Sequence, residues 1–332
     1  MGYKDLPKVE LHLHLDCSLS FEVASQINPR LSREEYENSF IAPPKCTDLA
    51  DYLSRAVKGF ELMQTPEQLR LVTLDLFRQL QADRVVYAEI RFAPLLHTQE
   101  GLSPEEVVQE VLNATREGMQ TYGVEARLIL CTLRHFDAGQ SLLTARLAGK
   151  FRETLVCGLD IAGDEAGYPI DAHVEAFQYA RARGIPCTAH AGEAKGADSV
   201  WETLREFHPQ RIGHGVRSVE DPKLVEFIRE KDLHLEVCPT SNIQVDVFDR
   251  MEDHPVDALY KKEVSLSINT DARTISDTTL AGEYGKLEHT FGWTRAHFKK
   301  CNLEGIRHAF APPEIKEKIR HILLEAYEGK DP

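Results

Sequence analysis

The sequence predicts an α/β protein, a (β/α)8 barrel with a helical cap inserted after the first strand. Short apolar runs rich in Val, Ile and Leu alternate with amphipathic stretches, as expected for parallel strands covered by helices. From the second run onward they recur every ~24 to ~40 residues, which leaves room for one helix between neighbours. No linker separates two halves of the chain, so we expect a single domain over residues 1–332.

The expected strands are the eight apolar runs Val9–Leu15, Val85–Phe92, Ala126–Leu133, Thr154–Ile161, Ile185–His190, Arg211–Gly213, Leu233–Cys238 and Val264–Thr270. The stretch between the first two, about residues 18–83, is longer than one crossover needs, and we interpret it as the helical cap. An open doubly wound sheet is the competing fold. It is disfavoured because no Gly-rich phosphate-binding loop follows an early strand.

Helix start and stop signals lie between the strands. Ser103 is a predicted N-cap, followed by Pro at the first helical position and by a capping-box Glu. Similar signals begin at Thr65 and Ser32, and Gly123 and Gly184 stand where helices are expected to end.

Composition narrows the class of partner. The 39 basic and 53 acidic residues give a net charge of −14, and an acidic surface repels both nucleic acid and anionic membranes. The 7 cysteines show no CxxC spacing, which is typical of reduced thiols, and no apolar run reaches the ~18 residues of a membrane helix. We expect a soluble, cytoplasmic protein without nucleic acid or membrane partners. The sequence does not specify an oligomeric state.

Polar residues alternate with leucines along the first expected strand. Its sequence is Glu10-Leu11-His12-Leu13-His14-Leu15-Asp16. Because successive side chains point to opposite faces, the leucines are expected to meet the helices and the polar set to point into the barrel. Inward ionisable groups are costly unless they bind something, and two histidines at i and i+2 can reach one metal ion. Alone, the pattern also fits two hydrogen-bonded histidines on a partly exposed edge strand.

Three further polar clusters stand at the C-terminal ends of expected strands, where barrel enzymes place their active sites. They are His190-Ala191-Gly192-Glu193, Gly213-His214-Gly215 and Asn269-Thr270-Asp271. Each alone has a structural explanation, such as a capped loop histidine or an N-cap aspartate. Together with the first strand they predict one site.

The residue types of this site predict metal chemistry. Three imidazoles and one carboxylate, with a water, form an open site for one divalent ion per chain, most typically Zn²⁺. The expected ligands are His12, His14, His190 and Asp271. Such an ion lowers the pKa of its water toward ~7. Glu193 can then protonate a ring nitrogen or a leaving group.

The flanking glycines of His214 are expected to let a substrate approach, so that His214 either takes the proton of the water or orients the attacking hydroxide. The fourth expected strand, Thr154–Ile161, lacks the modified lysine that usually bridges the two ions of barrel hydrolases with two metals, which favours a single ion. Cys238 lacks the PCxxC context of cytidine-type zinc deaminases and is expected to be a packed thiol.

Seven segments, taken in their order and spacing, carry a resemblance that runs nearly end to end. They are Pro7–Asp16, Tyr87–Arg91, Asp160–Glu165, His190–Glu193, Arg211–Gly215, Cys238–Asn242 and Ser267–Asp271. They resemble the adenosine deaminase family of the amidohydrolase superfamily, whose fold is the TIM barrel. The resemblance implies zinc-dependent hydrolytic deamination of a purine nucleoside, adenosine or 2′-deoxyadenosine, with release of ammonia.

The resemblance also implies roles for single residues. Glu193 would protonate purine N1, and metal-bound hydroxide oriented by Asp271 and His214 would add to C6. The substrate contacts would be made by His14, by the backbone of Gly163 at purine N3, and by Asp16 at a ribose hydroxyl. Because adenine deaminases of this kind look to carry Glu at the last position, Asp16 favours a nucleoside.

Two positions depart from the family pattern. Ala272 replaces an Asp that bonds purine N7, and a missing contact of this type costs ~1–3 kcal/mol. Arg273 and Asp277 are the candidates to supply it instead. Cys17 replaces a Gly at the sugar end of the pocket. These departures motivate an alternative, the same chemistry on a 5′-substituted adenosine such as aminodeoxyfutalosine.

Two other classes compete with a deaminase. One is a hydrolase of amides, lactones or phosphoesters on the same barrel, and the other is a barrel retained for binding alone. Among the remaining polar residues, Glu89 and Arg91 are expected in a structural ion pair or beside the metal ligands. A supporting role is equally open for Arg134 and His135, and Tyr52 is a candidate to line the pocket.

Overall fold

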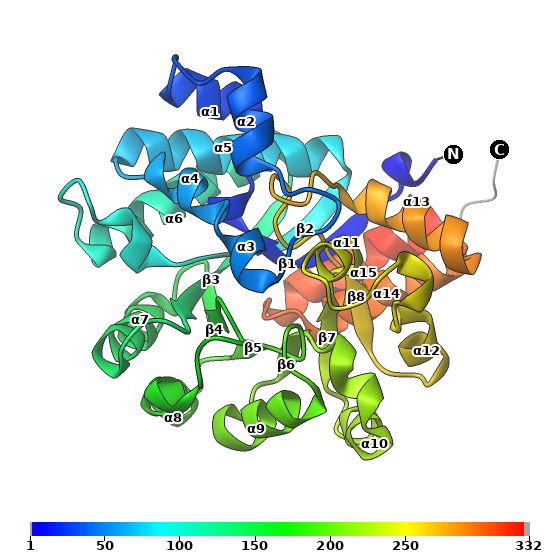
Figure 1. Cartoon of the computed structure of the whole chain (residues 1–332). Coiled ribbons are helices and arrows are strands. Elements are labelled where there is room, and N and C mark those ends of the chain that lie inside the picture. The colour runs from blue at the N-terminus through cyan, green and yellow to red at the C-terminus, as the bar shows by residue number, and fades with distance from the viewer. Residues whose placement is uncertain (1, 329–332) are drawn as a thin grey trace.

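The structure, a computed structural model, describes residues 2–328 and contains a barrel of parallel strands (Figure 1). The strands form two four-stranded sheets, in the orders β1-β2-β3-β4 and β5-β6-β7-β8. They are β1 Lys8–His14, β2 Val85–Phe92, β3 Glu125–Leu133, β4 Val156–Ala162, β5 Thr188–Ala191, β6 Arg211–His214, β7 His234–Val237 and β8 Leu266–Ile268. All eight expected strands are confirmed, with ends that differ by a few residues.

Two seams join the sheets into a closed barrel. Leu159 of β4 bridges Cys187 beside β5, and Leu13 of β1 bridges Asp271, which follows β8. At the second seam the His14 N–H donates to the Asp271 carbonyl at 2.8 Å. The (β/α)8 barrel is therefore confirmed and the open sheet is wrong. The second seam also fixes the backbone of Asp271 directly against the HxH strand.

Helices surround the strands in Figure 1. They are α1 Phe21–Ile27, α2 Arg33–Phe40, α3 Leu49–Leu53, α4 Ala56–Glu61, α5 Pro66–Ala82, α6 Pro104–Tyr122, α7 Ala138–Phe151, α8 Val174–Ala182, α9 Ala197–Phe207, α10 Pro222–Glu230, α11 Pro239–Gln244, α12 Val256–Lys261, α13 Leu280–Phe291, α14 Arg295–His308 and α15 Pro313–Glu328. Short 3-10 turns cover Tyr3–Asp5, Leu15–Cys17, Pro94–His97, Asp171–His173, Val216–Glu220 and Met251–Asp253. Within residues 2–328, no helix combines the length and the apolar character that crossing a bilayer requires.

The helix signals of the sequence are confirmed where they were expected. Thr65 and Ser103 form capping boxes at the starts of α5 and α6, and the Ser32 side chain caps α2. Gly123 ends α6 with a φ of 70°. Gly184 has a φ of 65° just beyond α8. In each case the side chain or the glycine satisfies terminal backbone groups that the helix leaves free.

The segment between β1 and α5 carries four short helices, α1 to α4. Helix α5 packs along α6 and precedes β2, so it is the helix of the first crossover, and the additional helices end at Glu61. Tyr52 and Leu49 of α3 pack against Ala272 and Ile275, which follow β8. This contact places α3 over the carboxyl ends of the strands. A capping function for the segment stays a prediction.

A register irregularity in β1 changes one expectation. The pairing shifts between Glu10 and Leu13, and the N–H groups of Leu11 and His12 both donate to the same side-chain oxygen of the loop after β8. This register shift, a β-bulge or a related irregularity, interrupts strict alternation. Glu10 is therefore bound by Arg273 at 2.6 Å and does not line the cavity. The expectation of one continuous polar face from residue 10 to residue 16 is wrong for Glu10.

Candidate active site

A cavity of about 460 Å³ opens at the carboxyl ends of the strands, within the range of small-molecule sites. The expected site residues that line it are His14, Asp16, Gly163, His190, Glu193, His214 and Asp271. The remaining one, His12, is fully buried and contacts the rings of His14, His190 and His214. The structure thus gathers residues from distant strand ends into one place, as the barrel prediction required.

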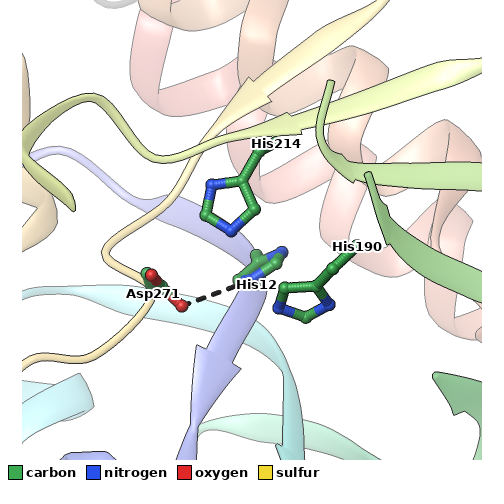
Figure 2. Close-up of side chains that lie close together, drawn as sticks. All are labelled: His12, His190, His214 and Asp271. Atoms are coloured by element: carbon green, nitrogen blue, oxygen red, sulfur yellow. Dashed lines mark ion pairs between the residues drawn. The ribbon is translucent and has the colours of Figure 1, made fainter. Parts of the chain in front are cut away.

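A cluster of ring nitrogens and one carboxylate lies at the centre of the site (Figure 2). The ligand atoms of His12, His190, His214 and Asp271 all lie within 4.8 Å of one another. His14 Nε2 is 3.3 Å from His190 Nε2 and 3.4 Å from Asp271 Oδ1. Five side chains therefore converge, one more than the four expected ligands.

Buried carboxylates orient two of these histidines. His12 Nδ1 lies 2.8 Å from Glu236 Oε2, and His190 Nδ1 lies 3.1 Å from Asp160 Oδ2. A carboxylate that accepts the Nδ1 proton leaves the Nε2 lone pair directed at the cluster. Both carboxylates also pair with Arg91. The sequence predicts no role for Glu236 or Asp160, because their pairing crosses strands that are far apart in the chain.

The surroundings of His12 favour a positive charge at the ring, which either a proton or a cation at Nε2 satisfies. Burial by itself lowers the pKa of His12, but the carboxylates of Asp271 and Glu236 on either side of the ring raise it above the ordinary value. Burial raises the pKa of Asp271, yet His12 and the other nearby histidines hold it well below the usual range. Asp271 is therefore ionised at neutral pH.

The other rings of the cluster are neutral. Burial lowers the pKa of His14 to about 3 and also lowers the pKa values of His190 and His214. Buried His12 Nε2 is 3.3 Å from Asp271 Oδ1 but has no hydrogen-bond partner. Neutral imidazoles, an ionised carboxylate and an unpartnered buried nitrogen fit a divalent metal ion.

Backbone strain marks the same place. His214 has a φ of 60° and Asp271 a φ of 61°, a left-handed region that residues with a side chain seldom adopt. Such strain persists where the surrounding structure enforces it, often at functional sites. The barrel seam holds Asp271, and the Ser241 hydroxyl donates to its Oδ2 at 2.7 Å. The second oxygen, Oδ1, is left facing the histidines.

Glu193 borders the cluster in surroundings that favour its protonated form. Its Oε2 lies 3.5 Å from His214 Nε2. Burial, with the charges of Asp271 and Glu165, raises the pKa of Glu193 well above its ordinary value. Glu165 accepts the backbone N–H of Glu193 at 3.0 Å, together with those of its neighbours, and so holds this loop. Arg134 supports the loop too, because its Nη2 donates to the His190 carbonyl.

The glycines beside His214 serve packing rather than substrate approach, contrary to expectation. A Cβ on Gly213 would lie 2.9 Å from the His12 ring, and one on Gly215 would meet the Leu235 side chain. Neither glycine lines the cavity, whereas Gly163 does, with a φ of 100°.

The wall around Ala272 is apolar. Ala272 is 2% exposed and packs with Tyr52 and Ile275, which also line the cavity. Arg273 does not replace the missing polar contact, because it is buried in ion pairs with Glu10 and Asp83. Asp277 does not either, because it is exposed and lies outside the lining. Both candidates are therefore wrong.

Other expected neighbours of the cavity are in place. Tyr52 lines it, with its hydroxyl 2.7 Å from Ser276 Oγ, and so do Cys17 and His135. Cys238 is a buried free thiol outside the metal cluster, as expected. Asp16 accepts the Ala93 N–H at 3.3 Å, which directs its carboxylate to the cavity rim.

Comparison with known proteins gives a consistent result. The family described as "Adenosine deaminase" matches residues 7–326. A relative named adenosine deaminase from Clostridium acetobutylicum is 34% identical over 322 residues, which are 95% of this chain and 96% of that protein. One from Enterococcus faecalis is 34% identical over 330 residues, 98% of each chain.

Solved structures show the same fold. An adenine deaminase from Arthrobacter aurescens aligns with a TM-score of 0.90 and 25% identity, over 98% of this chain and 100% of that one. An amidohydrolase from Burkholderia ambifaria, solved with bound Zn, aligns with a TM-score of 0.89 and 24% identity, over 98% of this chain and 92% of that one. With the family match over nearly its whole length, this chain belongs to the adenosine deaminase family.

Proposed function

We propose that the protein catalyses zinc-dependent hydrolytic deamination of adenosine or 2′-deoxyadenosine to the inosine nucleoside and ammonia. The observation that carries the proposal is the convergence of three imidazoles and one carboxylate beside Glu193, whose Oε2 lies 3.5 Å from His214 Nε2. One Zn²⁺ would be held by His12, His14, His190 and Asp271. When bound, this ion would supply Lewis-acid activation of a water molecule. The relative solved with bound Zn supports this choice of metal.

The protein's own groups then divide the remaining tasks. Glu193, whose pKa burial raises well above its ordinary value, donates a proton to purine N1, which makes C6 more electrophilic. His214 and Asp271 belong to the cluster (Figure 2) and orient the incoming oxygen nucleophile toward C6. The Gly163 backbone and the Asp16 carboxylate contact the base and the sugar.

The charge of the cavity favours an uncharged nucleoside over a nucleotide. Within the described chain, no Lys or Arg lines the cavity, whereas Asp16, Asp164 and Asp271 do. A phosphate monoester placed here would meet negative charge without a cationic partner. The relatives named adenosine deaminase support the same substrate class.

One alternative has its own structural support. Within the described residues, the wall at Ala272 offers neither of the expected replacements for the purine N7 contact. The lining extends along the inserted helices past Leu53, Val57 and Phe60, which are apolar. A 5′-substituted adenosine such as aminodeoxyfutalosine would use this surface for binding energy in place of the N7 contact. The chemistry at C6 would be unchanged.

Turnover on a panel separates these substrates. Ammonia release and loss of the adenine absorbance are measured with zinc-loaded protein on adenosine, 2′-deoxyadenosine, adenine, AMP and 5′-substituted adenosines. We expect kcat/KM to be highest for adenosine and its 2′-deoxy form. A 5′-substituted adenosine that exceeds them would transfer the assignment to the alternative, and hydrolysis of amides or lactones without ammonia release would overturn both.

A further inference from the structure

His214 stands at the end of a buried chain of hydrogen bonds that begins at a backbone N–H group. The Val256 N–H, at the start of α12, lies 3.1 Å from His254 Nδ1. His254 Nε2 lies 3.2 Å from Asn242 Oδ1, and Asn242 Nδ2 lies 3.1 Å from His214 Nδ1. The side chains of His254, Asn242 and His214 are at most 2% exposed. Water therefore does not compete for these bonds.

The donor and acceptor of each hydrogen bond in this series follow from the first bond, which the Val256 N–H makes. A backbone N–H can only donate, so His254 Nδ1 accepts and carries no proton. Burial lowers the pKa of His254 to about 3, so the ring is neutral and its single proton is on Nε2. That proton must be donated to the Asn242 oxygen. The amide nitrogen of Asn242 then faces His214 and donates to His214 Nδ1.

We infer that Asn242 and His254 are positioning residues that hold His214 in the tautomer protonated at Nε2. His214 consequently presents a hydrogen-bond donor to the cavity. Its Nε2 is buried and has no hydrogen-bond partner. The catalytic consequence rests on the proposed function, whereas the tautomer itself does not.

This tautomer distinguishes His214 from its neighbours in the cluster. His12 and His190 direct Nδ1 at carboxylates and present an Nε2 lone pair, as a metal ligand must. His214 lies equally close but presents a proton, so it does not ligate an ion there. It also cannot accept the proton of a water at Nε2. Of the two roles that the sequence left open, only orientation of the nucleophile by donation is compatible with this arrangement.

The protonated nitrogen can be observed directly. Zinc-loaded protein labelled with ¹⁵N-histidine is examined by NMR without substrate, and His214 is assigned from the signals missing in His214→Gln. We expect a proton on Nε2 and none on Nδ1. A proton on Nδ1 of the wild-type protein would overturn the inference, whatever the variants show.

Asn242→Asp tests the cause of this tautomer with almost no change of shape. A carboxylate accepts from both neighbours and cannot donate, so Nδ1 of His214 is expected to gain a proton. We expect kcat to fall about 10- to 100-fold, with KM nearly unchanged. An unchanged proton distribution on His214 in this variant would show that Asn242 does not set the tautomer.

Two further variants serve as controls. Asn302→Asp makes the same change at a buried asparagine that bonds Val9 and Tyr284 rather than a site residue, and it should leave the His214 signals unchanged. His254→Gln retains a donor toward Asn242 and should preserve the tautomer, whereas His254→Leu should lose it. A protein that shows the expected tautomer but deaminates nothing in the panel would refute the proposed function and leave this inference standing.

Discussion

Two groups of buried polar residues in the barrel follow opposite rules. The first, here called the ion-pair layer, consists of Glu89, Arg91, Asp160, Arg211 and Glu236, all fully buried. The second, the cavity layer, consists of His12, His14, His190, Glu193, His214 and Asp271. Most residues of both layers come from strands, although Glu193 and Asp271 follow β5 and β8, and a sequence pattern alone does not separate the layers.

The ion-pair layer is almost fully paired without a ligand. Arg211 bonds Glu89 at 2.5 Å and Glu236 at 2.6 Å, while Arg91 bonds Asp160 at 2.7 Å and Glu236 at 2.6 Å. Buried charges are tolerated when they are paired in this way, and Arg91 Nε is the one atom of these five side chains without a partner. Glu89 and Arg91 are thus structural, as expected, although each pairs with a different strand rather than with the other.

The cavity layer, in contrast, leaves buried ring nitrogens without hydrogen-bond partners. Nε2 of His12 and of His214 lack hydrogen-bond partners although both atoms are buried. A group of unpartnered donors and acceptors around a cavity is stable only if the rest of the fold supplies the free energy, and here the ion-pair layer holds His12 and His190 in place. The two layers are equally polar. They differ in how many of their buried polar atoms have partners within the protein, and this difference separates the structural layer from the candidate site.

The largest effect is expected from removing the ion that would complete the cavity layer. Dialysis against a chelator should abolish deamination, and added Zn²⁺ should restore it. The thermal midpoint should fall as well, because an ion that binds only the folded state stabilises it. Activity and thermal unfolding are measured on protein whose metal content has been determined. Full activity in metal-free protein would contradict the expected ligand set.

Replacement of the proton donor should remove rate without removing metal. Glu193→Gln keeps the size of the side chain but cannot transfer an acidic proton. We expect kcat/KM to fall about 10²- to 10⁴-fold, the usual contribution of a general acid, with zinc content unchanged. Glu117→Gln, on the surface, is the matched control. A Glu193→Gln protein with near wild-type rate would refute the assignment of Glu193 as the proton donor.

The ion-pair layer should respond in stability. Glu236→Gln leaves Arg91 and Arg211 with less compensation in a fully buried place, so the free energy of unfolding should fall by about 3–5 kcal/mol. Glu117→Gln breaks an exposed pair with Arg70 and should cost no more than about 1 kcal/mol. Urea unfolding measures both. Equal losses in the two variants would remove the distinction between the layers.

The sequence predicts most of the fold and the centre of the site because both depend on local patterns. Apolar runs at regular spacing specify the strands, and strand-end motifs such as His190–Glu193 follow from where barrels expose side chains. The register shift after Glu10 is not predictable, because it lies where β1 donates to a side chain that follows β8 and reaches β1 only in the folded barrel. The partners of His12 and His214 were missed for the same reason: Glu236 and Asn242 meet these rings only in the folded barrel.

The smallest expected effect tests whether the cavity also lacks a hydrogen-bond donor for the purine. Ala272→Asp places a carboxyl in the apolar wall beside Asp271, where burial and the adjacent negative charge raise its pKa and keep it protonated. A protonated carboxyl there can donate to purine N7. We expect kcat/KM for adenosine to rise about tenfold, equivalent to roughly 1.4 kcal/mol.

Ala272→Leu is the control for this variant, because it adds volume without a donor and should lower kcat/KM. A rise with Asp and a fall with Leu would mean that the wall faces N7 and that the present Ala272 weakens binding of adenosine. If both substitutions lower kcat/KM, the wall serves to exclude polar groups. Specificity would then reside in the apolar lining along α3 and α4, and the 5′-substituted substrates would become the stronger candidates.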